Sequence, residues 1–180
     1  MASAFLIIDM QMDMQARLDR GQDHVNGGAA TAIGRLLARF RKAGVPVLHV
    51  RHREDDPEGA FHASAATFQP MPQAREAEGE PVFVKTSSSA FPTTNLEHHL
   101  RDNGIDHLYV AGAVAGFCVN STVRSAADLG FRVSVIRDAV LGFDLGELSA
   151  QVIFDVTMGL LAADFATMTD TAAVLDEALV

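Results

Sequence analysis

The sequence predicts a single-domain α/β protein. We expect a three-layer α/β/α, Rossmann-like arrangement in which helices cover both faces of a central, mainly parallel six-stranded sheet. Short apolar runs rich in β-branched residues recur along the chain, and such runs are typical of strands buried on both faces. Helical patterns fill the intervals between them, and regular alternation of strand and helix is typical of a parallel sheet. The length of 180 residues suits one domain over residues 1–180.

Six segments are predicted as strands, and Val, Ile, Leu and Phe dominate them. Each is far shorter than the ~20 apolar residues that a membrane-spanning helix needs, so we expect no membrane partner. In chain order the predicted strands are 4–8, 45–50, 81–84, 107–111, 132–136 and a short one at 165–168.

The predicted helices follow from apolar periodicity and from residues that favour helix ends. Ile33, Leu36 and Phe40 recur at helical spacing, and Gly44 follows as a stop signal. Capping residues and glycines define the others in the same way. The predicted helices are 29–43, 93–103, 118–129, 149–163 and a last short one capped by residues 169–170.

The segment 53–80 does not fit the alternation, because it is long, proline-containing and acidic at its start. Loops longer than ~15 residues inside a compact domain are usually functional or disordered. Two interpretations stay open. One is a solvated insertion. The other is a lid or a subunit contact, because Phe61, Phe68 and Met71 are uncommon in a disordered linker.

Composition excludes several classes of function. The net charge of −9 argues against a nucleic-acid partner, because phosphate backbones are bound by basic surfaces. The single cysteine excludes an intramolecular disulfide and a zinc site built on several thiolates. Residues 1–5 contain no basic leader, so we expect a cytoplasmic protein. Glycine patterns for dinucleotides and for phosphates are missing, and we expect a small-molecule substrate and no cofactor.

Three chemically active side chains lie at the carboxyl ends of predicted strands. Asp9 ends the first strand, Lys85 ends the third, and Cys118 opens a helix after the fourth. Ligands of parallel α/β sheets bind at this edge, so an acid, an amine and a thiol would meet there. The position of Cys118 at a helix N-terminus favours its thiolate. The alternative is structural: a buried free cysteine, a turn-capping aspartate and a solvated lysine.

The stretches around Asp9, Lys85 and Cys118 can be compared with the motifs of known families. They are 6–11, 84–91 and 112–119, followed by 121–138. In order, spacing and placement they resemble the isochorismatase-like cysteine hydrolase superfamily, which includes nicotinamidases and N-carbamoylsarcosine amidases. The resemblance covers most of the chain.

This resemblance implies a catalytic triad of Asp9, Lys85 and Cys118. It implies a cis peptide between Ala113 and Val114, and an oxyanion hole formed by the backbone N–H groups of Val114 and Cys118. It also implies a homo-oligomer, a dimer or a tetramer.

Three further residues are assigned to the substrate pocket by the same resemblance. Gln11 would shape the pocket near Asp9, and Phe91 would line it. Ala115 stands where the family often has threonine, so the pocket would accept a smaller or more apolar group there.

The implied reaction is hydrolysis of a small amide or related C–N bond through a thioester. Asp9 takes the thiol proton of Cys118, and Lys85 stabilises the charges. The first alternative is vinyl-ether hydrolysis of the isochorismatase type, in which the cysteine is not essential. The alternatives of another class are a non-catalytic thiol sensor, which lacks a resolving cysteine in this chain, and a binding module.

The histidines do not suggest a metal site. Nicotinamidases typically carry an Asp-x-His motif after the second strand, and this chain has His49 and His52 there without the aspartate. Residues three apart on a strand point to opposite faces, so these two suit one metal ion poorly. We therefore predict no metal and expect both histidines at the surface or at the rim of the pocket.

Overall fold

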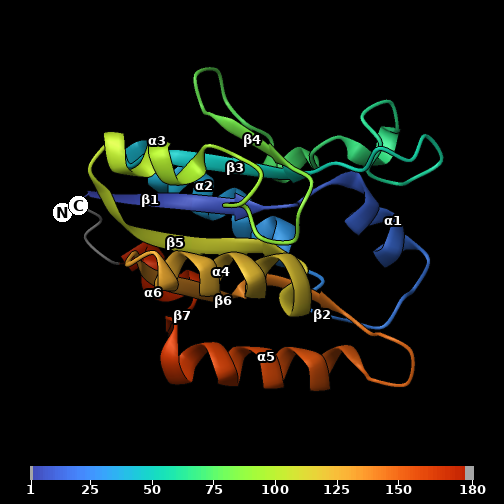
Figure 1. Cartoon of the computed structure of the whole chain (residues 1–180). Coiled ribbons are helices and arrows are strands. Elements are labelled where there is room, and N and C mark those ends of the chain that lie inside the picture. The colour runs from blue at the N-terminus through green and yellow to red at the C-terminus, as the bar shows by residue number, and fades with distance from the viewer. Residues whose placement is uncertain (1, 177–180) are drawn as a thin grey trace.

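A seven-stranded sheet runs through the middle of the protein in the spatial order β2–β6–β5–β1–β3–β4, with β7 also beside β6 (Figure 1). The computed structural model describes residues 2–176. All pairs are parallel except β2–β6, which is antiparallel. The strands are β1 (Ala2–Ile8), β2 (His24–Val25), β3 (Val47–His52), β4 (Val82–Lys85), β5 (Ile105–Ala113), β6 (Arg132–Phe143) and β7 (Thr167–Thr169). The six predicted strands are confirmed, and β2 is an addition at the edge.

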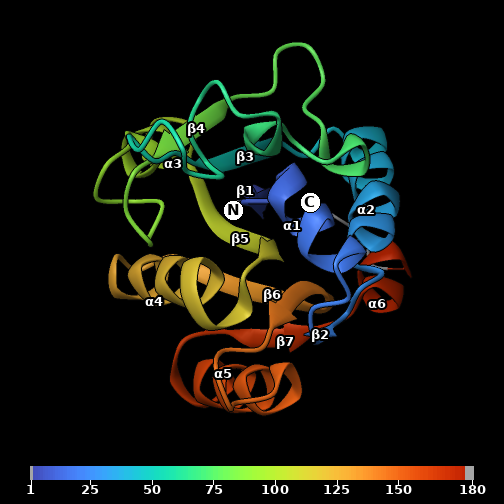
Figure 2. The same ribbon diagram turned by 90° about the vertical axis from the view of Figure 1, so that its right-hand side faces the viewer.

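Helices cover both faces of this sheet, as the sequence predicts (Figure 2). One apolar cluster packs α1, α2 and α6 against the sheet, and a second packs α3, α4 and α5 against the opposite face. The helices are α1 (Met12–Asp19), α2 (Ala29–Ala43), α3 (Leu96–Asp102), α4 (Asn120–Asp128), α5 (Ala150–Asp164) and α6 (Thr171–Asp176). No helix within residues 2–176 combines the length and the apolar character that crossing a membrane requires.

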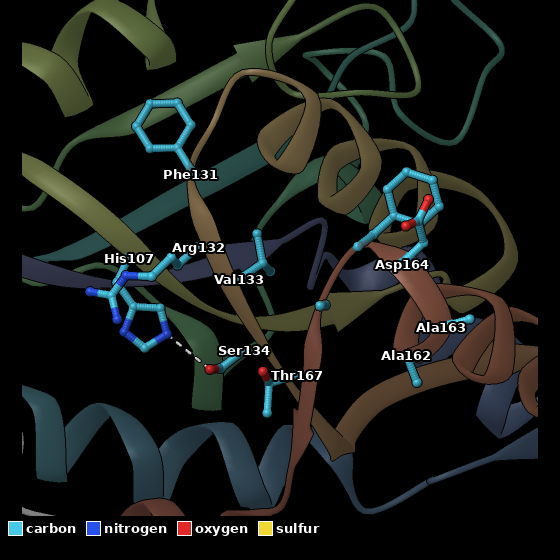
Figure 3. A pocket seen from close by; sticks show the side chains of 11 residues that line it. His107, Phe131, Arg132, Val133, Ser134, Ala162, Ala163, Asp164 and Thr167 are labelled. Atoms are coloured by element: carbon cyan, nitrogen blue, oxygen red, sulfur yellow. Dashed lines mark hydrogen bonds between the residues drawn. The ribbon is translucent and has the colours of Figure 1, made fainter.

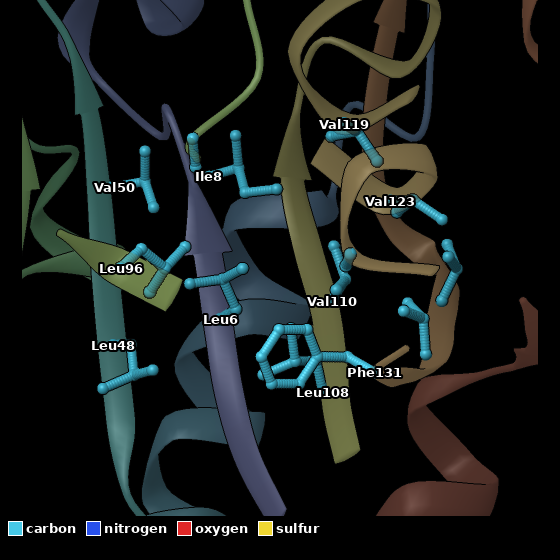
Figure 4. Close-up of a cluster of buried hydrophobic side chains, with 14 of the residues drawn as sticks. Leu6, Ile8, Leu48, Val50, Leu96, Leu108, Val110, Val119, Val123 and Phe131 are labelled. Atoms are coloured by element: carbon cyan, nitrogen blue, oxygen red, sulfur yellow. The ribbon is translucent and has the colours of Figure 1, made fainter. Parts of the chain in front are cut away.

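The central strand β1 explains how one sheet supports two cores. Alternate side chains point to opposite faces of a strand, so Leu6 and Ile8 enter one cluster while Phe5 and Ile7 enter the other. Figure 4 shows Leu6 and Ile8 beside Leu108, Val110 and Leu48 of the neighbouring strands. Burying each such side chain contributes roughly 1.5–3 kcal/mol, so these two faces supply much of the stability.

The structure differs from the predicted elements at two places near the carboxyl edge. Helix α1 was not predicted, because its apolar residues alternate with polar ones instead of following helical spacing, and only Asp13 and Met14 are buried. The helix predicted to start at Cys118 begins earlier, as a π-helical turn over Ala115–Val119 that runs into α4. Both elements lie beside the residues that the sequence singled out.

The segment 53–80 folds back onto this edge instead of extending away from it. Short 3₁₀ turns form at Ala66–Phe68 and Pro72–Ala74. Met71 is buried, and its N–H donates to the carbonyl of Met10 at 2.8 Å. The apolar residues that made this segment unusual therefore pack against the domain.

Strands β1 and β5 approach so closely at one point that only glycine fits there. Gly112 has φ of 128°, and a Cβ at this position would lie 2.0 Å from the carbonyl oxygen of Ile8. The contact is with backbone, which cannot swing aside like a flexible side chain. Gly112 thus brings the end of β1 next to the turn that carries Cys118.

We predict opposite effects of two glycine-to-alanine substitutions. Gly112→Ala lowers the free energy of unfolding by about 3 kcal/mol or more, because the strands must separate and the backbone is strained. Gly159→Ala, inside α5 with nothing within 4 Å of its Cβ position, raises it by about 0.5–1 kcal/mol through helix propensity. Urea unfolding of both variants measures this, and a Gly112→Ala protein as stable as the native one would contradict the account.

Candidate active site

Asp9, Lys85 and Cys118 come together at the carboxyl edge of the sheet. Nζ of Lys85 lies 2.7 Å from Oδ2 of Asp9 and 3.3 Å from Sγ of Cys118. The three residues follow β1, end β4 and lie in the turn after β5, so they come from segments far apart in the sequence. The shared edge of a parallel sheet is what brings them into contact.

The lysine at the centre of this cluster is fully buried. Its ammonium donates to the carbonyl of Ser87 at 3.1 Å and lies 3.4 Å from Nδ1 of His52, in addition to its contacts with Asp9 and Cys118. A buried charge is tolerated only when it is paired and hydrogen-bonded. Lys85 is therefore held in one position, and a solvated strand end does not describe it.

Asp9 combines an unusual backbone conformation with a buried carboxylate. Its φ is 49°, and its N–H donates to the carbonyl of Val50 at 3.0 Å. Burial raises the pKa of Asp9, and the nearby Lys85 ammonium opposes this shift. The carboxylate pairs with that ammonium at 2.7 Å and accepts a hydrogen bond from the Cys118 thiol. A carboxylate in contact with the thiol is placed to take its proton.

The thiol of Cys118 is not ionised at neutral pH. Burial raises its pKa to about 11, and the negative charge of Asp9 adds to the shift while Lys85 opposes it. The expectation that a helix N-terminus favours the thiolate is therefore wrong for the unliganded site. Desolvation and a neighbouring carboxylate outweigh the helix dipole here. The thiol lies next to a carboxylate that can take its proton.

The turn before α4 has an irregular backbone. The peptide bond between Ala113 and Val114 is cis. The carbonyl of Val114 accepts from the N–H groups of Phe117 at 3.0 Å and Val119 at 3.3 Å, which closes the π-helical turn that contains Cys118.

Gln11 connects the end of β1 to the end of β3 and to the 53–80 segment, beside this cluster. Its side chain is fully buried and bonds only to backbone atoms. Nε2 donates to the carbonyls of His52 at 3.0 Å and Phe68 at 2.9 Å, while the N–H of His52 donates to Oε1 at 2.9 Å. Gln11 therefore shapes the region near Asp9 by fixing the segment that follows β3.

The structure does not bring Phe91 and Ala115 to the surface of a cavity beside Cys118. Phe91 is buried in the apolar cluster under α3, where it stacks on Phe131 at 6.1 Å between ring centroids. Ala115 is fully buried in the same cluster. The family resemblance implied pocket positions for both residues, but the chain turns both side chains inward.

A cavity of about 340 Å³ opens over Asp9 and Cys118, with Lys85 buried behind them. Its lining joins polar groups from the ends of β1 and β3 with an apolar wall from α1, the 53–80 segment and the turn after β6. The lining residues are Asp9, Met14, Arg17, His52, Glu54, Phe61, Val114, Phe117, Cys118 and Leu145. The sequence did not indicate Met14, Arg17 or Leu145, because the helix that carries the first two was not predicted.

The two histidines of β3 have different environments. His52 lines the cavity, as expected for a residue at the rim, and burial followed by the charge of Lys85 lowers its pKa. His49 is buried and its Nε2 lies 2.9 Å from Glu80, so the expectation of a surface or rim position is wrong for it. Burial also lowers the pKa of His49. Within residues 2–176, no three His, Cys, Asp or Glu side chains gather as a metal site.

A second, larger hollow of about 500 Å³ lies near the opposite edge of the sheet (Figure 3). It is lined by the first residues of β6 and by the end of α5, and it contains the hydrogen bond between His107 and Ser134, at 2.9 Å. Ligand sites of parallel α/β sheets lie at the carboxyl ends of the strands. The cavity at Cys118 satisfies this rule, and the hollow in Figure 3 does not.

The fold and the polar cluster define an α/β protein with a buried acid, amine and thiol at the carboxyl edge of its sheet. Residues 3–173 match the sequence model of the Isochorismatase domain family. The chain belongs to the isochorismatase family of hydrolases, which confirms the resemblance seen in the sequence.

Individual relatives support this membership. The isochorismatase family protein YrdC of Bacillus subtilis is 28% identical over 173 residues, covering 93% of this chain and 91% of its own. N-carbamoylsarcosine amidase of an Arthrobacter species is 48% identical over 64 residues, which cover 36% of this chain and 24% of its own. A solved structure of the isochorismatase family from Chromobacterium violaceum has a TM-score of 0.90 at 30% identity, covering 97% of this chain and 92% of that one.

We predict that Asp9→Asn lowers the pKa of the Cys118 thiol below its native value of about 11. The substitution removes a negative charge that disfavours the thiolate and leaves the Lys85 ammonium in place. The pH dependence of alkylation by iodoacetamide measures this, and Cys118 is the single cysteine of the chain. Asp19→Asn, an equivalent change on α1 outside the cavity, serves as the control. An unchanged or higher thiol pKa in Asp9→Asn contradicts the assigned electrostatics.

Proposed function

We propose that this protein is a cysteine-dependent hydrolase that cleaves a small amide or related C–N bond through a thioester intermediate. The contact that carries the proposal is the one at Lys85, whose ammonium lies 2.7 Å from Asp9 and 3.3 Å from the Cys118 sulfur. Asp9 and Cys118 in turn line a cavity. An acid, an amine and a thiol in mutual contact form a nucleophile with its base and its counter-charge. Similarity to N-carbamoylsarcosine amidase supports an amide substrate.

In the proposed reaction Asp9 removes the proton of the Cys118 thiol as the sulfur attacks the substrate carbonyl. The oxyanion that forms is held by the backbone N–H groups of Val114 and Cys118. The tetrahedral intermediate collapses, the C–N bond breaks, and the proton passes from Asp9 to the leaving nitrogen. Water then attacks the thioester while Asp9 accepts its proton, and this proton returns to the departing sulfur.

The protonation states of the site suit this sequence of steps. The pKa of Cys118 is about 11, so the resting group is a thiol. Burial raises the pKa of Asp9, which makes it a stronger base than an exposed carboxylate. Lys85 keeps a positive charge between the two, so the proton can move without leaving an isolated charge in the buried site.

The cavity limits what can be cleaved. Its volume of about 340 Å³ lies at the lower end of the ~300–1,000 Å³ of small-molecule sites. The proposed chemistry uses side chains and backbone alone, so it requires neither a metal nor a cofactor. The net charge of −9 disfavours a nucleic-acid partner. We place the protein in the cytoplasm, where a single free thiol stays reduced.

We also propose a homo-oligomer, a dimer or a tetramer, in which a second copy covers the outer face of α5. The stripe Val152, Val156 and Leu160 is more than half exposed and recurs at four-residue spacing. It borders a groove of about 470 Å³ that shares Phe117 and Leu145 with the cavity at Cys118. A contiguous apolar stripe of this kind is typical of a subunit contact, and its covering would also close one wall of the cavity.

We predict that Cys118→Ala reduces turnover at least about 10³-fold, because the variant lacks the nucleophile. Ammonia release from carboxamides, ureas and carbamoyl compounds measures turnover, and rapid quenching followed by mass spectrometry detects the acyl adduct on Cys118. Ser121→Ala is the control in the adjacent helix, and the native enzyme should keep its activity after exhaustive chelation. Full turnover by Cys118→Ala would remove the thiol from the mechanism, whereas a native enzyme that releases no ammonia from any of these compounds would favour vinyl-ether cleavage instead.

We predict that Val152→Lys combined with Val156→Lys produces a smaller species than the native protein, because like charges then face each other across the contact. Light scattering coupled to size-exclusion chromatography measures the mass. Gln151→Lys adds a charge to the same helix beside the stripe and should leave the assembly unchanged. A native protein that is monomeric at micromolar concentrations rules the contact out.

A further inference from the structure

Arg17 is a cation in the cavity at Cys118 that the proposed reaction does not use. The formally charged residues that line this cavity are Asp9, Arg17 and Glu54, all within the described chain. Asp9 is matched by the Lys85 ammonium at 2.7 Å. The remaining lining from Met14, Phe61 and other apolar residues contributes no charge. Arg17 therefore presents an unused positive group to whatever molecule enters.

The guanidinium is fixed in place by one edge only. Its Nε donates to Oδ2 of Asp13 at 2.8 Å, and the carboxylate of Asp13 is itself buried. Its central carbon lies 5.5 Å from the centroid of the Phe143 ring. The structure gives the terminal nitrogens no other partner within residues 2–176, so they remain available to bind an acceptor. Planar terminal N–H groups of this kind suit a carboxylate.

Two carboxylates lie near Arg17, but within residues 2–176 neither bonds to its terminal nitrogens. Glu54 lies at the rim with a side chain that is 44% exposed, where water screens its charge, and it lies 3.6 Å from His52. The buried carboxylate of Asp13 pairs with Arg17 as an i,i+4 helix pair and offsets part of its positive charge. Because Asp13 contacts Nε, the terminal N–H groups of Arg17 are left to donate to an acceptor in the cavity.

We propose that Arg17 binds an anionic group of the substrate, so that the substrate is a small amide or carbamoyl compound that also carries a carboxylate. This inference rests on the proposed function of Cys118. The reacting carbonyl lies over the sulfur, the carboxylate lies at Arg17, and the short chain between them contacts Met14, Phe117 and Leu145. Binding energy from the remote carboxylate then positions the amide for attack.

The first experiment compares three amides that share the CH2CH2–C(O)NH2 unit and differ in the charge of the group at its other end: succinamate, butyramide and β-alaninamide. The native enzyme should have its highest kcat/KM for succinamate, the anion. In Arg17→Met the ratio of kcat/KM for succinamate to that for butyramide should fall about 10- to 100-fold, through the loss of a charge-assisted contact. Arg20→Met makes the same change at the end of α1, outside the cavity, and should leave the ratio unchanged. A native preference for butyramide or β-alaninamide overturns the inference.

The second experiment does not depend on hydrolysis. It measures the rate at which 3-bromopropionate and 3-bromopropionamide alkylate Cys118, followed by mass spectrometry at fixed pH. The ratio of the anionic to the neutral reagent should fall at least about tenfold in Arg17→Met. Arg17→Gln combined with Asp13→Asn gives the same readout without leaving a buried carboxylate alone, in case the single variant does not fold.

The two experiments separate the two proposals. If no amide is cleaved but the alkylation ratio falls in the Arg17 variants, the anion site stands and the proposed hydrolysis fails. If amides are cleaved and neither ratio changes in the Arg17 variants, the hydrolysis stands and the role of Arg17 is wrong.

Discussion

The buried ammonium of Lys85 is the constraint on which the site depends. A fully buried cation is stable only where acceptors surround it, and here they are the carboxylate of Asp9 at 2.7 Å and the carbonyl of Ser87 at 3.1 Å. Asp9 follows β1 and Lys85 ends β4, and these two strands are separated in the sheet by β3. The carboxyl ends of β1 and β4 must therefore lie at the same height along the strand direction. The close contact of Gly112 with Ile8 brings the turn of Cys118 to the same level from the other side.

The convergence of Asp9, Lys85 and Cys118 could be predicted because it depends only on strand ends. Apolar runs locate the ends, and a parallel sheet gathers them at one edge. The cavity above them could not be predicted in the same way. Met14 and Arg17 lie on α1, a polar helix whose burial comes from contacts with segments distant in the sequence. The inward turn of Phe91 likewise depends on its stacking with Phe131, forty residues further along the chain.

The charge state of the thiol shows where local reasoning fails. The dipole at the start of a helix stabilises a thiolate. Burial destabilises the thiolate by a larger free energy. The pKa of Cys118 is therefore raised to about 11, and the pKa of Asp9 is raised as well. Neither effect is visible in the residues adjacent to Cys118, because both come from packing. In the proposed reaction the nucleophile forms only as a substrate carbonyl arrives, which protects the sulfur from oxidants that react with thiolates.

Gln11 fixes the chain at two points through backbone atoms: the N–H and carbonyl of His52, directly before the 53–80 segment, and the carbonyl of Phe68 within it. These hydrogen bonds use no side chain of the segment. Side chains between the two points can therefore be exchanged without removing these hydrogen bonds. Phe61 and Glu54, which face the cavity from it, are accordingly positions where substrate preference can diverge between related enzymes, or be redesigned, while the fold and the reacting groups stay the same.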